Sequence, residues 1–188
     1  ATTTPLSEVD IATFDAVFYP GGHGPLWDLA DDPTSQQIIL DSDAVGRPLG
    51  LVCHAPGVLH TVKKHDGTLF VTDRSVTGFT DGEEEAAGLT GVVPFLVEDS
   101  LKQAGARYSK GPDGDSYVVT DKTLVLVKIR PRPLPQPSGC STYYVFESRY
   151  VMKGPESFQH GMKRARSFGL AEHTMAVSYT HLRAHETP

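Results

Sequence analysis

Short apolar runs alternate with polar, helix-like stretches along the first two thirds of the chain. The run FDAVFY at residues 14–19 ends in the glycine-rich PGGHG, which is typical of a buried strand that enters a turn. The run RPLGLVC at residues 47–53 predicts a second buried strand. Between them, Asp32 as N-cap, Pro33 in the first turn and Gly46 as the stop predict a helix. This order of strand, helix and strand predicts a parallel βαβ unit with a right-handed crossover.

The pattern continues in the same way as far as Val125. Residues 75–89, SVTGFTDGEEEAAGL, predict a helix with an acidic start. Residues 116–125, SYVVTDKTLV, predict two short strands around an Asp-Lys turn. Between these segments, a further helix is predicted by an apolar stripe with Pro94 near its start and Gly105 at its end, made of Val93, Leu96, Val97, Leu101 and Ala104. Residues 1–125 therefore predict an α/β sandwich.

Beyond Val125 the pattern stops. Prolines occupy positions 131, 133, 135 and 137, a density that cannot join a sheet ladder. The charge also reverses, because residues 1–126 hold 8 basic and 19 acidic side chains, whereas residues 127–176 hold 8 and 3. A disordered proline-rich segment is the plain interpretation of residues 126–176.

Composition restricts the kind of partner. With 188 residues, 39% of them hydrophobic and 21% charged, the chain fits one globular domain with an irregular tail. A formal net charge of −6 and the absence of a basic run interleaved with aromatics argue against a nucleic-acid partner. No apolar stretch approaches the ~20 residues that span a bilayer, and the first residues lack the pattern of a signal peptide. We therefore expect a cytoplasmic protein that acts on a small or neutral substrate.

The stretch LVCHAPGVL at residues 51–59 predicts a nucleophile elbow at Cys53. A side chain on a tight turn between a parallel strand and a helix stands above the sheet, next to the free N–H groups of the helix start. Those groups lower the pKa of a thiol and can bind an oxyanion, so we expect a Cys53 thiolate at neutral pH. The alternative is that Cys53 is only a small buried residue.

Two neighbouring motifs favour the catalytic interpretation. The GGHG turn at residues 21–24 ends the preceding strand, and the carboxyl ends of adjacent parallel strands lie side by side where ligands bind. One of Glu83, Glu84 and Glu85 could place a carboxylate near His54 and complete a Cys-His-acid set. For at least two of these glutamates, we expect a solvated helix start.

Four motifs in order resemble the DJ-one/ThiJ/PfpI superfamily, also called class I glutamine amidotransferase-like, and within it the heat-shock glyoxalase III branch. They are AVFYPGGHGPLWDL, LVCHAPGVL, VTGFTDGEEEAAGL and VPFLVEDSLKQAGARYSKGPD. The resemblance covers about residues 5–125. It implies a flavodoxin-like three-layer sandwich with a mainly parallel sheet, a cysteine at the elbow and a homodimer.

The resemblance also implies roles for individual residues. Cys53 matches the nucleophile and His54 its histidine, while Glu84 occupies the place of the acid that orients the histidine. Glu85 is the nearest rival if the register slips by one residue.

The glycine-rich turn matches the substrate-binding side of the site. Gly22 and the backbone of His54 match the amides that bind the oxyanion, with His23 and Gly24 beside Gly22 in the same motif.

The activity that the resemblance implies is a cysteine-dependent, glutathione-independent conversion of methylglyoxal to D-lactate, or deglycation of proteins. The substrate would be a small aldehyde or a glycated protein, and neither a metal nor an organic cofactor is required. Two alternatives remain open: a stress chaperone or redox sensor with an oxidisable Cys53, and a PfpI-like amidase or peptidase.

The chain departs from the family at both ends. The segment that carries a further glutamate in the family, the partner of the cysteine, has no counterpart before residue 5, so the chain as written could be inactive. After Val125, the codons of VKIRP read one base earlier can spell Gly-Gln-Asn-Pro-Ala, which resembles the family. We therefore interpret residues 126–176 as a frameshifted reading, which an intact reading frame at codon 126 would disprove.

The last residues, 177–188, resemble a translated sequencing adapter. His181 and His185 have the spacing of a helical metal site, but because they lie in this tail we assign them no metal. Cys140 falls in the suspect segment and receives no role.

Overall fold

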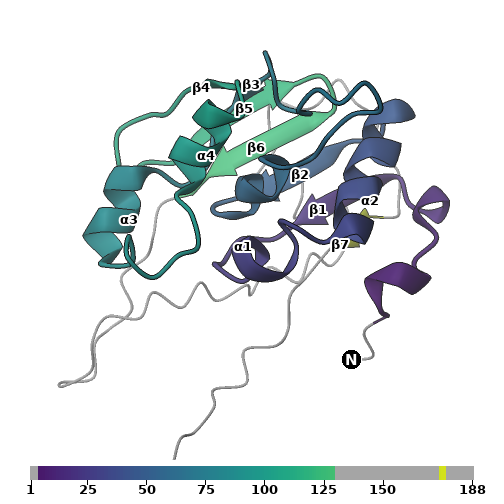
Figure 1. Cartoon of the computed structure of the whole chain (residues 1–188), viewed down its shortest axis with the longest axis horizontal. Coiled ribbons are helices and arrows are strands. Elements are labelled where there is room, and N and C mark those ends of the chain that lie inside the picture. Colours follow the sequence, from purple (N-terminus) through teal and green to yellow (C-terminus); the bar gives the residue numbers. More distant parts are fainter. Residues whose placement is uncertain (1–3, 130–173, 177–188) are drawn as a thin grey trace, which may run out of the picture.

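The computed structural model describes residues 4–129 and the backbone of residues 174–176. Its main sheet has five strands in the order β5-β6-β2-β1-β7, drawn in Figure 1. Along the chain these are β1 (Ala16–Tyr19), β2 (Leu49–Val52), β5 (Tyr117–Asp121), β6 (Leu124–Lys128) and β7 (Thr174–Ala176). Every neighbouring pair is parallel except the β5–β6 hairpin. The mixed α/β fold with a mainly parallel sheet, as expected of the flavodoxin-like class, is thus confirmed.

Strands β1 and β2 form where the apolar runs predict them. Val17 pairs with Leu49 and Tyr19 with Leu51, and all four side chains are buried. Because the two strands are parallel neighbours, their carboxyl ends open at the same edge of the sheet. The turn after β1 and the elbow after β2 therefore lie next to each other.

Short helices surround the sheet, and their ends follow local chemistry. They are η1 (Leu6–Glu8), η2 (Ile11–Thr13), α1 (Pro25–Asp28), α2 (Pro33–Ala44), η3 (Ala55–Leu59), α3 (Asp81–Ala87) and α4 (Val97–Gln103), where η marks 3-10 helices. A second, two-stranded sheet pairs β3 (Ser75–Val76) with β4 (Arg107–Tyr108) in parallel. Helix α2 begins as predicted, because the Asp32 carboxylate accepts a 2.6 Å hydrogen bond from the backbone N–H of Ser35.

Two helix predictions need correction. Helix α4 begins at Val97, four residues after the predicted start at Val93, because the backbone N–H of Val93 bonds back to the carbonyl of Leu89 in a turn. Leu96 then serves as N-cap in an extended conformation. After the elbow, the expected helix is only the five-residue 3-10 helix η3. Its N-terminus is therefore a weaker source of positive potential than a full α-helix would be.

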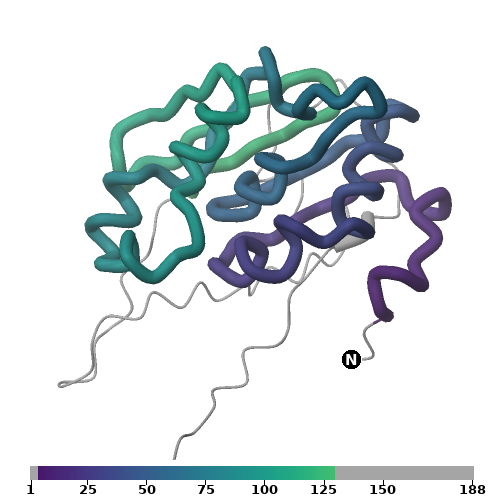
Figure 2. The backbone as a smooth tube through the Cα atoms, in the orientation of Figure 1, coloured from purple at the N-terminus to yellow at the C-terminus, as the bar shows by residue number. Residues whose placement is uncertain are grey.

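Helices α1, α2 and α4 lie with η3 on one face of the sheet (Figures 1 and 2). Helix η3 packs against β2, α1 and α4, and Gln36 of α2 donates a hydrogen bond to Thr61 just beyond η3. The second helical layer of the predicted three-layer sandwich is not among the described residues. Within the part of the chain that is described, no helix is long and apolar enough to cross a membrane.

The predicted boundary after Val125 falls inside a strand. Strand β6 runs to Lys128, and its alternation places Leu124, Leu126 and Lys128 on the buried side. The Lys128 ammonium is fully buried and donates to the Glu83 carboxylate at 2.7 Å. The frameshift hypothesis for residues 126–176 stays a prediction, and Cys140, His181 and His185 lie outside the described residues.

Candidate functional site

Cys53 occupies a strained elbow directly after β2. Its φ of +63° lies in the left-handed region, which is unusual for a residue other than glycine and costs on the order of 1–3 kcal/mol. The surrounding backbone holds it there: Cys53 N–H bonds to the carbonyl of Val127, and the Cys53 carbonyl accepts from Phe79 N–H, both at 2.8 Å. The predicted strand-to-turn elbow is thus present.

The glycine turn after β1 packs directly against this elbow. A Cβ placed on Gly21 would lie 2.8 Å from the Cys53 Cβ, so a larger residue at position 21 would overlap Cys53. Gly22 has a φ of +99°, which favours glycine, and its backbone hydrogen-bonds the Cys53 sulfur together with the backbone of His54. The two glycines therefore serve different purposes, close packing and backbone conformation.

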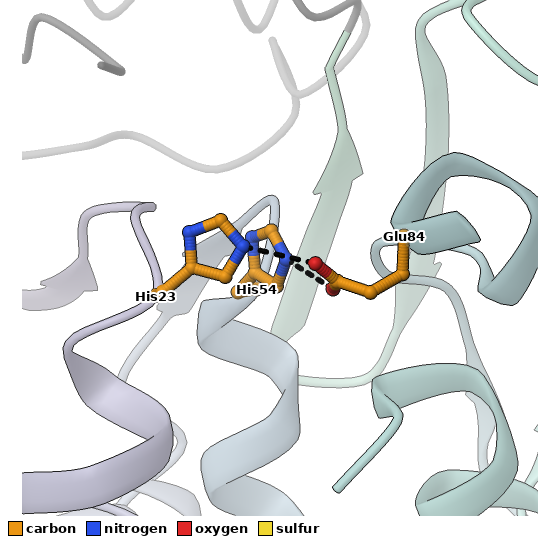
Figure 3. Close-up of side chains that lie close together, drawn as sticks. All are labelled: His23, His54 and Glu84. Atoms are coloured by element: carbon orange, nitrogen blue, oxygen red, sulfur yellow. Dashed lines mark hydrogen bonds and ion pairs between the residues drawn. The ribbon is translucent and has the colours of Figure 1, made fainter. Parts of the chain in front are cut away.

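A continuous hydrogen-bonded path joins Cys53, His54 and Glu84. The Cys53 Sγ lies 3.2 Å from His54 Nδ1, and His54 Nε2 lies 2.7 Å from a Glu84 carboxylate oxygen. Figure 3 shows the imidazole edge of His54 directed at this carboxylate. The structure thus brings together the three residues predicted as nucleophile, base and orienting acid.

The protonation of this path follows from the pKa values of its members. Burial alone would raise the pKa of Glu84, but hydrogen bonds from His23 and His54 outweigh it and lower that pKa to about 2. An ionised carboxylate only accepts hydrogen bonds, so His54 Nε2 carries the proton and Nδ1 presents a lone pair. Burial lowers the pKa of His54, which keeps the ring neutral. His54 Nδ1 is therefore placed to receive the Cys53 proton.

The expectation of a resting thiolate is wrong for this structure. Cys53 is fully buried, and burial raises the pKa of its thiol to about 12. Hydrogen bonds from the backbone of Gly22 and His54 lower it, but they do not compensate, and the charges of Glu83 and Glu84 raise it further. The nucleophile is held as a thiol that must lose its proton during the reaction.

The three consecutive glutamates have three different environments. Glu84 is buried in the site, whereas Glu85 is exposed, so the one-residue register slip is excluded. Glu83 is also buried, where it forms a capping box with Thr80 and binds the buried Lys128. The expectation of at least two solvated glutamates is therefore wrong, because only Glu85 is exposed. Sequence spacing could not separate these roles, since helix periodicity alone does not say which carboxylate faces β2.

His54 packs against two rings. The His23 ring centroid lies 3.9 Å from that of His54 and the Phe79 ring centroid 4.0 Å from it, and both rings are tilted relative to the imidazole. Phe79 received no role from sequence reasoning, although it lies within the GFTDG motif. These close ring contacts restrict rotation of the imidazole, whose Nδ1 lies 3.2 Å from the Cys53 sulfur.

His23 makes a contact that the sequence did not predict. Its Nε2 lies 3.0 Å from the second Glu84 oxygen, while its predicted role in substrate binding stays a prediction. Gly24 is the N-cap of α1. Its substrate-binding role stays a prediction. Within the described residues, His23, His54 and Glu84 form one group of metal-ligating side chains, with donor atoms within 4.8 Å of one another.

Comparison with known proteins finds relatives of this chain. The glutathione-independent glyoxalase HSP31 of Saccharomyces cerevisiae is 33% identical over 125 residues, covering 63% of this chain and 52% of the relative. Protein/nucleic acid deglycase 2 of Escherichia coli is 28% identical over 130 residues, covering 69% and 60%. The chain spans about half the length of the curated relatives it matches. No protein-family model matches it.

Solved structures agree with the sequence comparison. The Rapid Encystment Protein 24 kDa of Francisella tularensis is 39% identical, with a TM-score of 0.65 over 66% of this chain and 56% of that chain. Glyoxalase III of Candida albicans is 26% identical, with a TM-score of 0.61 over 67% and 55%. The chain is thus similar in sequence and fold to proteins of the DJ-one/ThiJ/PfpI superfamily, and its relatives there include glyoxalases and a deglycase.

Proposed function

We propose that this chain carries the catalytic centre of a glutathione-independent glyoxalase that converts methylglyoxal to D-lactate with Cys53 as nucleophile. The observation that carries the proposal is the hydrogen-bonded path from the Cys53 sulfur through His54 to Glu84. Relatives named glyoxalase in two yeasts support the substrate class.

In the first step, His54 Nδ1 takes the Cys53 proton as the sulfur attacks the aldehyde carbon of methylglyoxal. A general base is needed because burial holds the thiol pKa at about 12. The imidazolium that forms is stabilised by the Glu84 carboxylate, 2.7 Å from Nε2. The product is a hemithioacetal, whose oxygen is oriented by the backbone N–H groups of Gly22 and His54.

The next steps move hydrogen within the substrate. The hydrogen on C1 transfers to C2 through an enediol, so C1 is oxidised to a thioester while C2 is reduced to an alcohol. Water then cleaves the C1–S bond, which releases lactate and returns the thiol. The overall reaction adds one water to methylglyoxal and needs no external oxidant or reductant.

The same centre suits carbonyl adducts of proteins. Such an adduct presents the carbon skeleton of methylglyoxal joined to an amine, and thiol attack on it would release that amine. The name of the Escherichia coli relative, a protein/nucleic acid deglycase, supports this extension.

The test is consumption of methylglyoxal with enzymatic detection of D-lactate, without glutathione, on the purified 188-residue chain. We expect turnover that disappears in Cys53→Ala, because the proposed mechanism uses the Cys53 sulfur as the attacking atom. Cys140→Ala is the matched control, since it removes the other cysteine of the sequence and should leave the rate unchanged.

Two results would overturn the proposal. One is a folded chain without D-lactate formation. The other is turnover that survives in Cys53→Ala. Oxidation of Cys53 by peroxide, with no turnover of methylglyoxal, would favour the redox-sensor alternative instead.

A further inference from the structure

The Glu84 carboxylate lies between two imidazoles and uses one oxygen for each. His23 Nε2 is 3.0 Å from one oxygen and His54 Nε2 is 2.7 Å from the other. Figure 3 shows both Nε2 atoms facing the same carboxylate. A triad alone would need only one of these contacts, so the role of the second imidazole is unexplained by the proposed chemistry.

The donor set is one that binds zinc. Two imidazole nitrogens and one carboxylate oxygen, with a fourth position open to water, make up the His₂Glu sites of zinc enzymes. Ligand distances of about 2.0–2.2 Å place tetrahedral donors roughly 3.4 Å apart. The three donor atoms here lie within 4.8 Å of one another, so small side-chain rotations would complete the geometry.

The surroundings of the cluster suit a cation. Glu84 and His54 are almost fully buried, at 2% and 0% exposure, whereas the His23 side chain is 19% exposed. An ion would therefore enter past His23 and reach an ionised carboxylate in a region of low dielectric. The Cys53 sulfur contacts the Nδ1 edge of His54 and does not belong to this donor set.

We propose that His23, His54 and Glu84 form a Zn²⁺-binding site whose occupancy switches the Cys53 centre off. To bind the ion, both Nε2 atoms must be free of hydrogen, so each neutral ring carries its proton on Nδ1. His54 Nδ1 then points an N–H at Cys53 and cannot accept the thiol proton. The proposal of Zn²⁺ binding depends only on the geometry of the three side chains. The proposal that zinc switches the Cys53 centre off rests on the proposed function.

The binding test uses the full chain, stripped of metal with EDTA and carrying His181→Gln and His185→Gln to remove the paired tail histidines. Zn²⁺ is titrated in competition with a chromophoric chelator. We expect one tight equivalent in this background and at least about tenfold weaker binding in His23→Gln. His65→Gln is the matched control, because His65 is exposed and outside the cluster.

The conservative variant His23→Asp guards against a folding artefact, since aspartate is also a zinc ligand. It should retain binding that His23→Gln loses, and both variants should keep the circular dichroism spectrum of the parent. Equal affinities for the parent and His23→Gln would overturn the zinc site.

The switch has its own readout. Zn²⁺ at one equivalent should abolish methylglyoxal turnover and EDTA should restore it. Whatever turnover His23→Gln shows without metal, Zn²⁺ at one equivalent should not lower it. Activation by Zn²⁺ would overturn the inhibitory assignment. If the chain binds zinc through His23 but the metal-free chain shows no methylglyoxal turnover, the proposed function fails and the metal site stands.

Discussion

Glu84→Gln tests whether the carboxylate fixes both the stability and the tautomer of the site. In the folded state its pKa is about 2, against an ordinary value of 4.5. At about 1.4 kcal/mol per pKa unit, the ionised side chain contributes about 3 kcal/mol to the free energy of unfolding at neutral pH. Glutamine resembles the protonated side chain, so the variant should lose about this amount at pH 7.

The pH dependence gives the sign of the effect. A depressed carboxyl pKa stabilises the fold above the unfolded value, and this contribution disappears as the pH falls from 4.5 towards 2. Urea unfolding of both proteins between pH 7 and pH 3 measures it. The difference in unfolding free energy between wild type and Glu84→Gln should stay constant from pH 7 to about pH 5 and shrink as the pH falls below 4.5.

Catalysis should fall more steeply than stability. The glutamine amide accepts only one imidazole N–H and presents its NH₂ to the other, which favours the wrong tautomer of His54. Loss of the equivalent carboxylate in a serine protease triad lowers kcat about 10⁴-fold, so we expect a loss on the order of 10²–10⁴ in kcat with little change in KM.

Glu85→Gln is the matched control, because it makes the same change one residue along the helix on an exposed side chain. It should alter the free energy of unfolding by less than about 0.5 kcal/mol. If Glu84→Gln behaves like Glu85→Gln in both assays, the reasoning about the buried carboxylate is refuted.

Three further changes probe the elbow and the buried ion pair. Gly21→Ala should destabilise the fold by about 1–3 kcal/mol and lower turnover, because its Cβ would lie 2.8 Å from the Cys53 Cβ; unaltered unfolding would contradict this packing. Alkylation of Cys53 by iodoacetamide should be slow at pH 7 and rise through pH 10, since the thiol pKa is about 12; a plateau near pH 7 would mean a resting thiolate. Lys128→Met should cost about 3–5 kcal/mol in urea unfolding, because it leaves the Glu83 carboxylate buried without its cation; a cost below 1 kcal/mol would contradict the pair.

Each of these changes has a control in the same chain. Gly91→Ala adds a methyl group where nothing lies within 4 Å and should be neutral. Cys140→Ala removes the second cysteine from the alkylation assay. Lys63→Met removes an exposed lysine and should change the unfolding free energy by less than about 0.5 kcal/mol.

Local signals in the sequence determined the elements that position the site. The apolar runs predicted strands β1 and β2, and the Asp32 cap followed by Pro33 predicted the start of α2. The elbow at Cys53 also follows from the sequence, because an apolar strand that ends at Cys-His before Ala-Pro-Gly leaves little choice of turn. These features depend on residues that are neighbours in the chain.

The tertiary structure decided what depends on distant residues. It selects Glu84 over Glu85, brings His23 to the second carboxylate oxygen 61 positions away, and packs the Phe79 ring against His54. It also reverses the expected state of the Cys53 thiol, because full burial outweighs the hydrogen bonds that the turn supplies. The local sequence determines which side chains are present. Their burial and the partners of each charge, which set the pKa values, are determined only when separate elements pack together.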